Sequence, residues 1–355
     1  MKKLSLLILS LILSIVIVKA QDEEDEGLQI SGSVDTYWKY DFSGYKDGNG
    51  LSNIPTSFAD NQNSISIGMI DVALSQTVGK ASFVGEFSFG PRSFKSIPLF
   101  DTDGDGETDD AYVGIQNLYA SYAFTDAFSL TAGYMGTFVG YEVISPAGNF
   151  NYSTSYLFSF GPFQNSGIKA DFTISDRFAF MVGLFNDWNV YQDFNGVSDF
   201  GAQLYFMPID GWDIYVNFVT GDPSGTIIDL TTGWQITDGF YLGLNAADYT
   251  AKGEDAGGYS GVALYPQLSL SDAVSLGLRY EYFNLKEYKE SDGSTVNKEN
   301  VNAFTLTANL KAGPLTVIPE FRLDGASDEF FYKDSEGMDM TKSASQFLIG
   351  AVYAF

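Results

Sequence analysis

The chain of 355 residues has no histidine and no cysteine. The absence of histidine excludes an imidazole base and a His-ligated metal, and the absence of cysteine excludes disulfides, zinc–thiolate sites and a thiol nucleophile. No Ser–Lys or paired-carboxylate motif replaces them, so we expect no enzymatic activity and predict no catalytic residue. Basic residues are also few, with 19 Lys and Arg against 45 Asp and Glu. The net charge of −26 argues against binding a nucleic-acid backbone.

Long apolar runs are equally scarce. One run, residues 4–18, follows Lys2 and Lys3. It is shorter than the roughly 20 residues that a membrane-spanning helix needs. Val18-Lys19-Ala20 ends the run and resembles a signal-peptidase site. We interpret residues 1–20 as a cleaved signal peptide and residues 21–27 as an acidic tail. The alternative is a retained N-terminal anchor, whereas a lipid anchor is not expected because no cysteine follows the cut.

Alternating side chains dominate the rest of the chain. In residues 28–42 apolar side chains occupy the even positions, and Asp35 and Lys39 are among the polar side chains at odd positions. This period of two predicts a strand that is long enough to cross a bilayer at a tilt, which takes about 9–11 residues. Similar alternation recurs at 117–124, 168–174, 274–282 and 315–324. Pro319 lies inside the last segment, and we expect a β-bulge there because proline cannot donate to the ladder.

A short repeat separates several of these segments. Aspartate closes tight turns by accepting hydrogen bonds from its own backbone. The four copies are Thr125-Asp126-Ala127-Phe128, Ser175-Asp176-Arg177-Phe178, Thr237-Asp238-Gly239-Phe240 and Ser271-Asp272-Ala273-Val274. Tight turns alternate with longer polar connections, which gives about sixteen strands, and the last strand alternates up to Phe355.

This arrangement predicts an all-β domain over residues 28–355. We expect a transmembrane antiparallel up-and-down β-barrel of about 16 strands, with short periplasmic turns and long extracellular loops. Aromatic residues make up 16% of the chain, and those near the strand ends fit the girdles of such barrels. A secreted β-sandwich is the alternative, although it would leave the polar face of each long strand without solvent.

The chain resembles the OmpL-like β-barrel porin family of the Bacteroidetes type. The stretches that carry the resemblance are Ala132-Gly133-Tyr134, Gly140-Tyr141-Glu142, Asn151-Tyr152-Ser153, Gly161-Pro162 and Gly167-Ile168. Members of the family often have a histidine just before the last of these glycines. This chain has Asn165-Ser166 there, so any role of that histidine does not carry over. The resemblance implies a barrel in the outer membrane.

The number of strands bears on function, because about sixteen strands enclose a water-filled lumen whereas eight can be filled by side chains. We therefore expect an outer-membrane porin for passive diffusion of small hydrophilic solutes or ions. A closed or plugged barrel that acts as a structural or adhesive surface protein is the alternative. A gated transporter with a separate plug domain does not fit the length of the chain.

The connection 140–165 is the longest, and we predict that it folds into the lumen with Tyr141 and Glu142 near the narrowing. An ordinary surface loop is the alternative. Charged side chains of both signs fall on predicted inner faces, where they would line the pore. They are Asp35, Lys39, Lys169, Asp171, Arg279, Glu281, Glu320 and Arg322. Acidic residues in the connection 325–342 predict a modest cation preference.

One loop resembles a calcium-binding loop. Asp101, Asp103 and Asp105 precede Gly106, as in the first half of an EF-hand loop. Tyr112 stands at the twelfth position instead of glutamate, and Asp109 or Asp110 could supply further oxygens. The alternative is a solvated acidic turn. We expect no required cofactor beyond this Ca²⁺ site.

The expected partners follow from the predicted location. An integral outer-membrane protein, exported through the inner membrane by its signal peptide, contacts outer-membrane lipid and lipopolysaccharide. The C-terminal Phe355 resembles the signal that the barrel-assembly machinery recognises. A homotrimer is a further expectation, since many sixteen-strand porins are trimers.

Overall fold

The computed structural model describes residues 27–98, 113–289 and 293–355. Sixteen antiparallel strands form one closed barrel in sequence order, in which the last strand pairs with the first. The predicted fold is therefore confirmed. The barrel strands are β1 (Gln29–Asp41), β2 (Ser64–Val78), β3 (Ala81–Phe89), β4 (Val113–Thr125), β5 (Phe128–Gly136), β6 (Gln164–Ser175), β7 (Phe178–Phe185), β8 (Asp199–Phe206), β9 (Trp212–Gly221), β10 (Gly225–Thr237), β11 (Phe240–Thr250), β12 (Gly258–Ser271), β13 (Val274–Leu285), β16 (Glu299–Ala312), β17 (Leu315–Ala326) and β20 (Ser343–Ala354).

The alternation in the sequence becomes the two faces of the barrel wall. On β1, Asp35 and Lys39 point inward and are buried, whereas Ile30 and Val34 point outward and are exposed. Ile65 on β2 is 87% exposed, and similar apolar side chains cover the outer surface of the other strands. Such an exterior is stable in lipid, where closed barrels satisfy every backbone hydrogen bond between strands. None of the helices within the described residues is long and apolar enough to cross a membrane.

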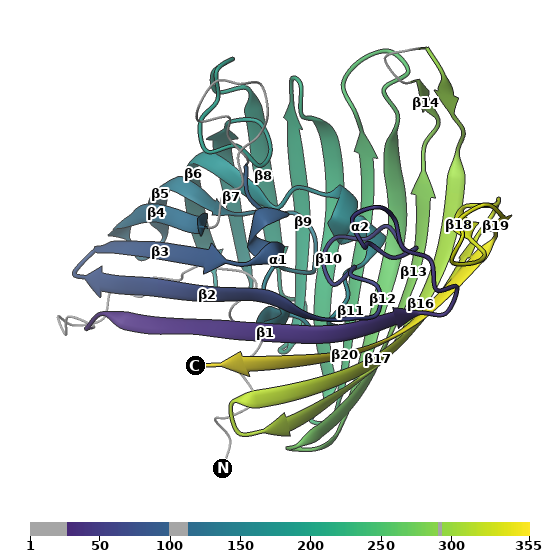
Figure 1. Cartoon of the computed structure of the whole chain (residues 1–355). Helices are drawn as coiled ribbons and strands as arrows, with labels where there is room; N and C mark the ends of the chain where they lie inside the picture. The colour runs from purple at the N-terminus through teal and green to yellow at the C-terminus, as the bar shows by residue number, and fades with distance from the viewer. Residues whose placement is uncertain (1–26, 99–112, 290–292) are drawn as a thin grey trace.

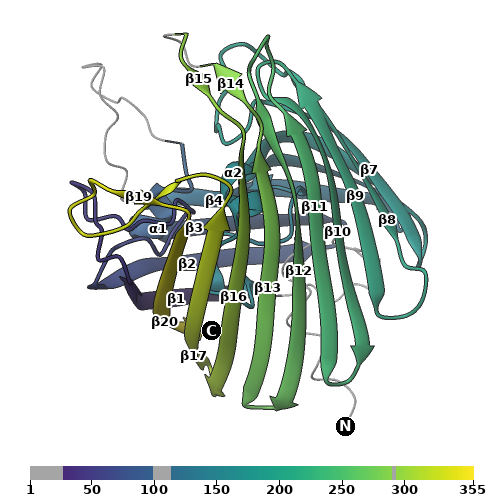
Figure 2. The ribbon, with the colours of Figure 1, turned by 90° about the vertical axis from the view of Figure 1, so that its right-hand side faces the viewer.

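Short turns gather at one end of the barrel, together with the C-terminus (Figures 1 and 2). Two small hairpins lie in the loops at the opposite end. One pairs β14 (Tyr288–Lys289) with β15 (Thr295–Val296), and the other pairs β18 (Phe331–Tyr332) with β19 (Met340–Thr341). The connection 222–224 departs from the expected pattern, because it belongs to the long-loop end but has only three residues between β9 and β10.

The bulge predicted at Pro319 is wrong. β17 pairs with β20 in one register from Leu315 to Gly325, with Pro319 opposite Ile349. The ladder therefore tolerates the missing N–H without an inserted residue. Register shifts lie instead beside the four Asp-containing turns, for example between Ala123 and Thr125, and also at Val34/Thr36 on β1 and Glu86/Phe87 on β3.

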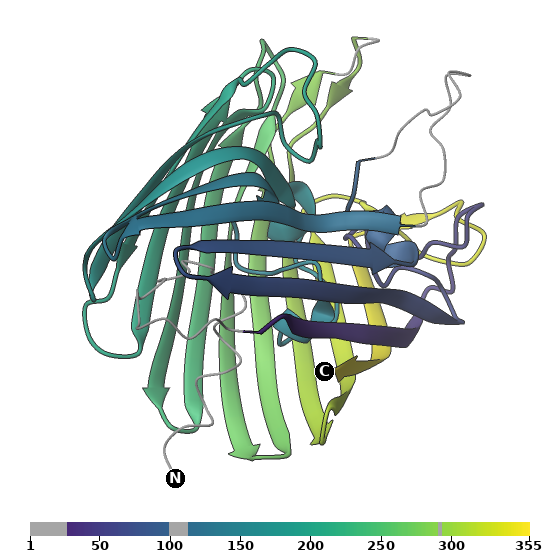
Figure 3. The same ribbon diagram turned by 90° about the vertical axis from the view of Figure 1, so that its left-hand side faces the viewer.

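The barrel interior holds part of the chain. Residues 137–163, which we call the inner loop, connect β5 to β6 and contain the 3₁₀ helix η1 (Pro146–Gly148) and the helix α2 (Tyr156–Phe160). A second short helix, α1 (Pro91–Phe94), lies between β3 and β4. Both helices lie within the ring of strands, and Figure 3 shows β1–β3 crossing in front of the more upright β10–β13. Tyr156 and Leu157 of α2 are buried in an apolar cluster with Tyr259 and Phe283 of the wall.

The seam between β1 and β20 offers a test of the fold. Gly32 and Phe355 exchange two backbone hydrogen bonds of 3.0 Å, and a Cβ on Gly32 would lie 2.2 Å from the carbonyl oxygen of Asp71. We expect Gly32→Val to lower the free energy of unfolding by about 1–3 kcal/mol through overpacking. The readout is the urea midpoint of the refolded barrel. Gly48→Val is the matched control, since no atom lies within 4 Å of a Cβ there. An equal midpoint for both variants would contradict the close packing of Gly32 against β2.

Candidate pore and constriction loop

The inner loop crosses the lumen and attaches to the wall from its first residues onward. The backbone N–H of Gly140 donates to Asp229 of β10 at 3.0 Å. The hydroxyl of Tyr141 donates to that of Tyr241 on β11 at 3.0 Å, and its ring stacks on Tyr265 of β12 with centroids 4.2 Å apart. Tyr141 therefore lies in the lumen against the wall.

Glu142 and Arg279 form a buried ion pair between the inner loop and β13. Nη1 of Arg279 donates to Oε1 of Glu142 at 2.7 Å and to the carbonyl oxygen of Ser153 at 2.6 Å. The side chain of Arg279 is 0% exposed, and that of Glu142 is 4% exposed. A charge at this depth needs a partner, so the pair ties two parts of the inner loop to one point of the wall.

Carboxylates of the wall accept hydrogen bonds from the backbone of the inner loop. Glu281 accepts from the N–H groups of Tyr156 and Leu157 at 2.9 and 2.7 Å. Glu320 accepts from the N–H of Tyr152 at 3.0 Å and from the hydroxyl of Ser153. The two bonds to Glu281 satisfy amides at the start of α2 that have no partner within the helix, whereas those to Glu320 hold the segment just before it. The inner faces of β13 and β17 thus form a binding surface for the loop backbone.

Arg322 and Asp324 on β17 extend this binding surface. Nε of Arg322 lies 2.8 Å from Oδ1 of Asp324, and Nη1 donates to the carbonyl oxygen of Thr154 at 2.8 Å. The hydroxyl of Tyr156 donates to Asp324 at 2.7 Å. Burial raises the pKa of the Tyr156 hydroxyl well above its ordinary value, so this group remains a neutral donor.

Arg92 of α1 joins three loops, and the sequence analysis missed it. Its guanidinium lies over the rings of Phe58 and Tyr152, 4.8 and 5.2 Å from their centroids. Nη1 donates to the carbonyl oxygen of Ile144 at 3.2 Å, and Nη2 lies 3.6 Å from Asp35. A single arginine in a polar loop has no periodic signal in sequence, and only the tertiary contacts reveal its position.

Three glycines of the wall provide space for aromatic rings of the inner loop. A Cβ on Gly243, Gly277 or Gly350 would lie 2.3 Å from an atom of Tyr141, Phe150 or Tyr152, respectively. Each of these rings therefore packs directly on the backbone of a strand. The sequence analysis missed these glycines too, because a glycine in a strand does not reveal what packs on it.

All eight charges that were predicted to line the pore lie on inner faces, but their surroundings differ. Six of them are at most 2% exposed, because loops folded into the barrel cover them. They are Asp35, Lys39, Arg279, Glu281, Glu320 and Arg322. The expectation of a water-facing row needs correction for these six, most of which hold the inner loop. Lys169 and Asp171 on β6 are each 16% exposed and form an ion pair of 3.0 Å.

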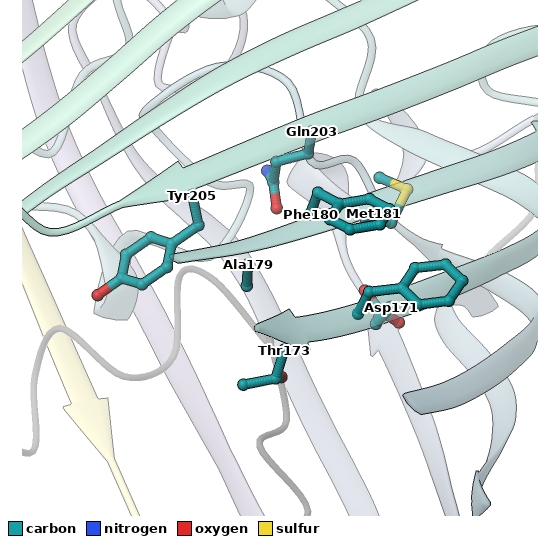
Figure 4. A pocket seen from close by; sticks show the side chains of 8 residues that line it. Asp171, Thr173, Ala179, Phe180, Met181, Gln203 and Tyr205 are labelled. Atoms are coloured by element: carbon teal, nitrogen blue, oxygen red, sulfur yellow. The ribbon is translucent and has the colours of Figure 1, made fainter. Parts of the chain in front are cut away.

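The wall of β3–β9 toward the short-turn end keeps partly exposed polar side chains on its inner face. Glu86 on β3 accepts a 2.5 Å hydrogen bond from Asn117 on β4. A shallow hollow, open to solvent, lies between β6 and β8 (Figure 4). Its inward side chains include Asp171, Gln203 and Tyr205. This wall is the side of the lumen that the inner loop leaves accessible.

The predicted calcium site lies outside the described residues, since Asp101, Asp103, Asp105, Asp109 and Asp110 all belong to the segment 99–112. The predicted signal peptide and the predicted acidic tail up to residue 26 also lie outside them. Within the described parts of the chain, no three acidic side chains come together in a way that could hold a metal ion.

The buried pair at the inner loop yields a prediction. Arg279→Met leaves Glu142 buried without its partner, which costs about 3–5 kcal/mol for an ion pair of this kind. We expect a lower urea midpoint and faster proteolysis within the inner loop. Arg177→Met is the matched control, because Arg177 forms a 2.7 Å pair with Asp210 whose side chains are 54% and 88% exposed. If the two variants lost equal stability, the anchoring role of Arg279 would be refuted.

Solved structures with a similar fold include outer-membrane proteins and porins. The trimer form of in-vitro folded OmpT of Vibrio cholerae has a TM-score of 0.55 at 14% identity, covering 93% of this chain and 99% of that one. The outer-membrane channel DcaP of Acinetobacter baumannii has a TM-score of 0.58 at 11% identity, covering 92% and 97%. An anion-selective porin from Comamonas acidovorans has a TM-score of 0.55 at 11% identity, covering 94% and 100%. At these identities the likeness shows the fold alone.

Sequence comparison is more specific. No curated protein sequence matches the chain. The model of the family described as "Putative beta-barrel porin-2, OmpL-like" matches residues 27–355, which confirms the resemblance noted above. The chain belongs to the OmpL-like family of β-barrel porins.

Proposed function

We propose that this outer-membrane porin conducts small hydrophilic solutes or ions by passive diffusion, with a modest preference for cations. The observation that carries the proposal is the asymmetry of the lumen. The inner loop is fastened to β10–β13, β16 and β17, whereas the polar inner wall from β3 to β9 stays partly exposed. A path between the loop and this wall would be narrow and lined by water-accessible side chains.

The charges on the accessible wall support the cation preference. Asp213 is partly exposed there and forms no ion pair with a described lysine or arginine, while Lys169 is neutralised by Asp171. Acidic loops at the mouth add to the same field, which concentrates cations and repels anions. We also propose that the protein is not an enzyme, which its membership of the porin family supports.

The decisive experiment is single-channel recording of the refolded protein in a planar bilayer under a KCl gradient. We expect stable open steps and a reversal potential of cationic sign. Asp213→Asn should move the reversal potential toward zero, and Lys169→Met should move it further in the cationic direction. A neutral or anionic potential would contradict the preference. A folded barrel that never conducts would favour the structural or adhesive surface protein instead.

The constriction role of the inner loop has its own test. Removing residues 150–160 deletes α2 and the ring of Phe150, and thereby opens the part of the lumen that they occupy. We expect a clearly larger single-channel conductance. The control is removal of residues 333–339 from the exposed hairpin loop between β18 and β19, which should leave the conductance nearly unchanged. Equal conductance of the first variant and the unaltered protein would exclude a constriction by this loop.

Assembly and location extend the proposal. Export by a signal peptide, contact with lipopolysaccharide and insertion by the barrel-assembly machinery through Phe355 fit an integral outer-membrane barrel. A homotrimer is supported by the trimer form of the similar Vibrio cholerae OmpT. For the segment Asp101–Asp110 we keep the Ca²⁺ site as a proposal, and calorimetry that detects no Ca²⁺ binding to the folded protein would end it.

A further inference from the structure

The hollow on the inner wall between β6 and β8 arises from one small side chain. Ala179 on β7 stands opposite Thr173 on β6 and opposite Tyr205 on β8. Because its side chain is only a methyl group, the wall is recessed between these two larger neighbours. Figure 4 shows Tyr205 and Gln203 on one side of the recess and Asp171 and Thr173 on the other. The recess lies near the short-turn end of the barrel.

An aromatic surface adjoins the hollow. Tyr205 stands opposite Tyr215 on β9, and their ring centroids are 4.9 Å apart at an interplanar angle of 37°. The hydroxyl of Tyr205 donates to Oδ1 of Asp213 at 2.7 Å. A carboxylate is therefore fixed at the hydroxyl edge of a ring whose other parts border the recess. Both tyrosines and Asp213 are partly exposed.

The polar atoms around this surface are mainly acceptors. The lysine and amide donors nearby are already used, since Lys169 is bound to Asp171 and Nε2 of Gln203 donates to Asn217 at 2.8 Å. Asp213 has no ion pair with any described lysine or arginine. Its carboxylate accepts a hydrogen bond from the neutral hydroxyl of Tyr205, which leaves its charge unbalanced. A ligand that suits the surface must supply a flat apolar face and a positive donor. Ammonium groups also gain from the faces of nearby tyrosine rings.

We propose that Tyr205, Tyr215 and Asp213 form a subsite for small organic ammonium cations that carry an aromatic ring. The ring of the ligand lies on Tyr205 over the recess left by Ala179, and its ammonium group reaches Asp213. The subsite rests on the proposed function, because it lies along the path between the inner loop and the accessible wall. Binding at this subsite gives the channel a preference for one class of cation. A diffuse acidic field cannot provide such a preference.

The test uses benzylammonium chloride as the probe and benzyl alcohol as its neutral counterpart. With the channel open in KCl, we expect benzylammonium to block the current transiently and benzyl alcohol to have no effect. Asp213→Asn and Tyr205→Leu should each weaken the block by about tenfold. Tyr205→Phe keeps the ring but releases Asp213, and should weaken the block less than Tyr205→Leu does.

The control variant is Asp126→Asn, which removes a carboxylate from an exposed turn at the same end of the barrel. It should leave the block unchanged. Equal block by benzyl alcohol, or an unchanged block in both Asp213→Asn and Tyr205→Leu, would overturn the subsite while the channel itself stands. If the protein does not conduct KCl at all, the proposed function fails. Calorimetric titration of benzylammonium into the detergent-solubilised barrel then decides the subsite alone, since binding that requires Asp213 supports it and no binding refutes it.

Discussion

The interior of this barrel depends on carboxylates that accept hydrogen bonds from the backbone of another segment. Glu281 and Glu320 are almost fully buried on the inner faces of β13 and β17, where an unpaired charge would be very costly. The inner loop supplies their partners through its N–H groups. These bonds in turn give acceptors to loop amides that have no strand partner. The carboxylates of the wall and the backbone of the inner loop therefore stabilise each other.

This mutual dependence makes the lumen asymmetric. Aromatic rings of the loop pack onto wall glycines such as Gly277 and Gly350, and Arg92 adds the neighbouring loops to the same assembly. The covered half resembles a protein core with charged and apolar layers. The other half, between β3 and β9, keeps side chains in contact with solvent. For the proposed channel, we expect selectivity to come from a few residues of the accessible wall, because the covered charges are paired with the inner loop.

The alternating pattern was a sufficient guide to the wall. Outward side chains such as Ile30 and Val34 and inward ones such as Asp35 followed directly from a period of two, since a strand offers only two faces. The Asp-containing turns marked four strand ends for an equally local reason. Local reasoning failed at Pro319, where the predicted bulge is absent, because the partners on both sides hold the register. It also failed for Arg92, whose partners are far away in sequence.

The amino-acid sequence by itself determined the class of protein, the order of the strands and the face of each side chain, because these depend on short-range periodicity and turn chemistry. It also placed the eight charges on inner faces. Only the tertiary structure decided what those charges do. Arg279 contacts Glu142 instead of water because a loop more than one hundred residues away in sequence folds into the lumen. No local sequence pattern encodes such a long-range contact. The same holds for the recess beside Tyr205, which exists because three strands bring a small side chain between larger ones.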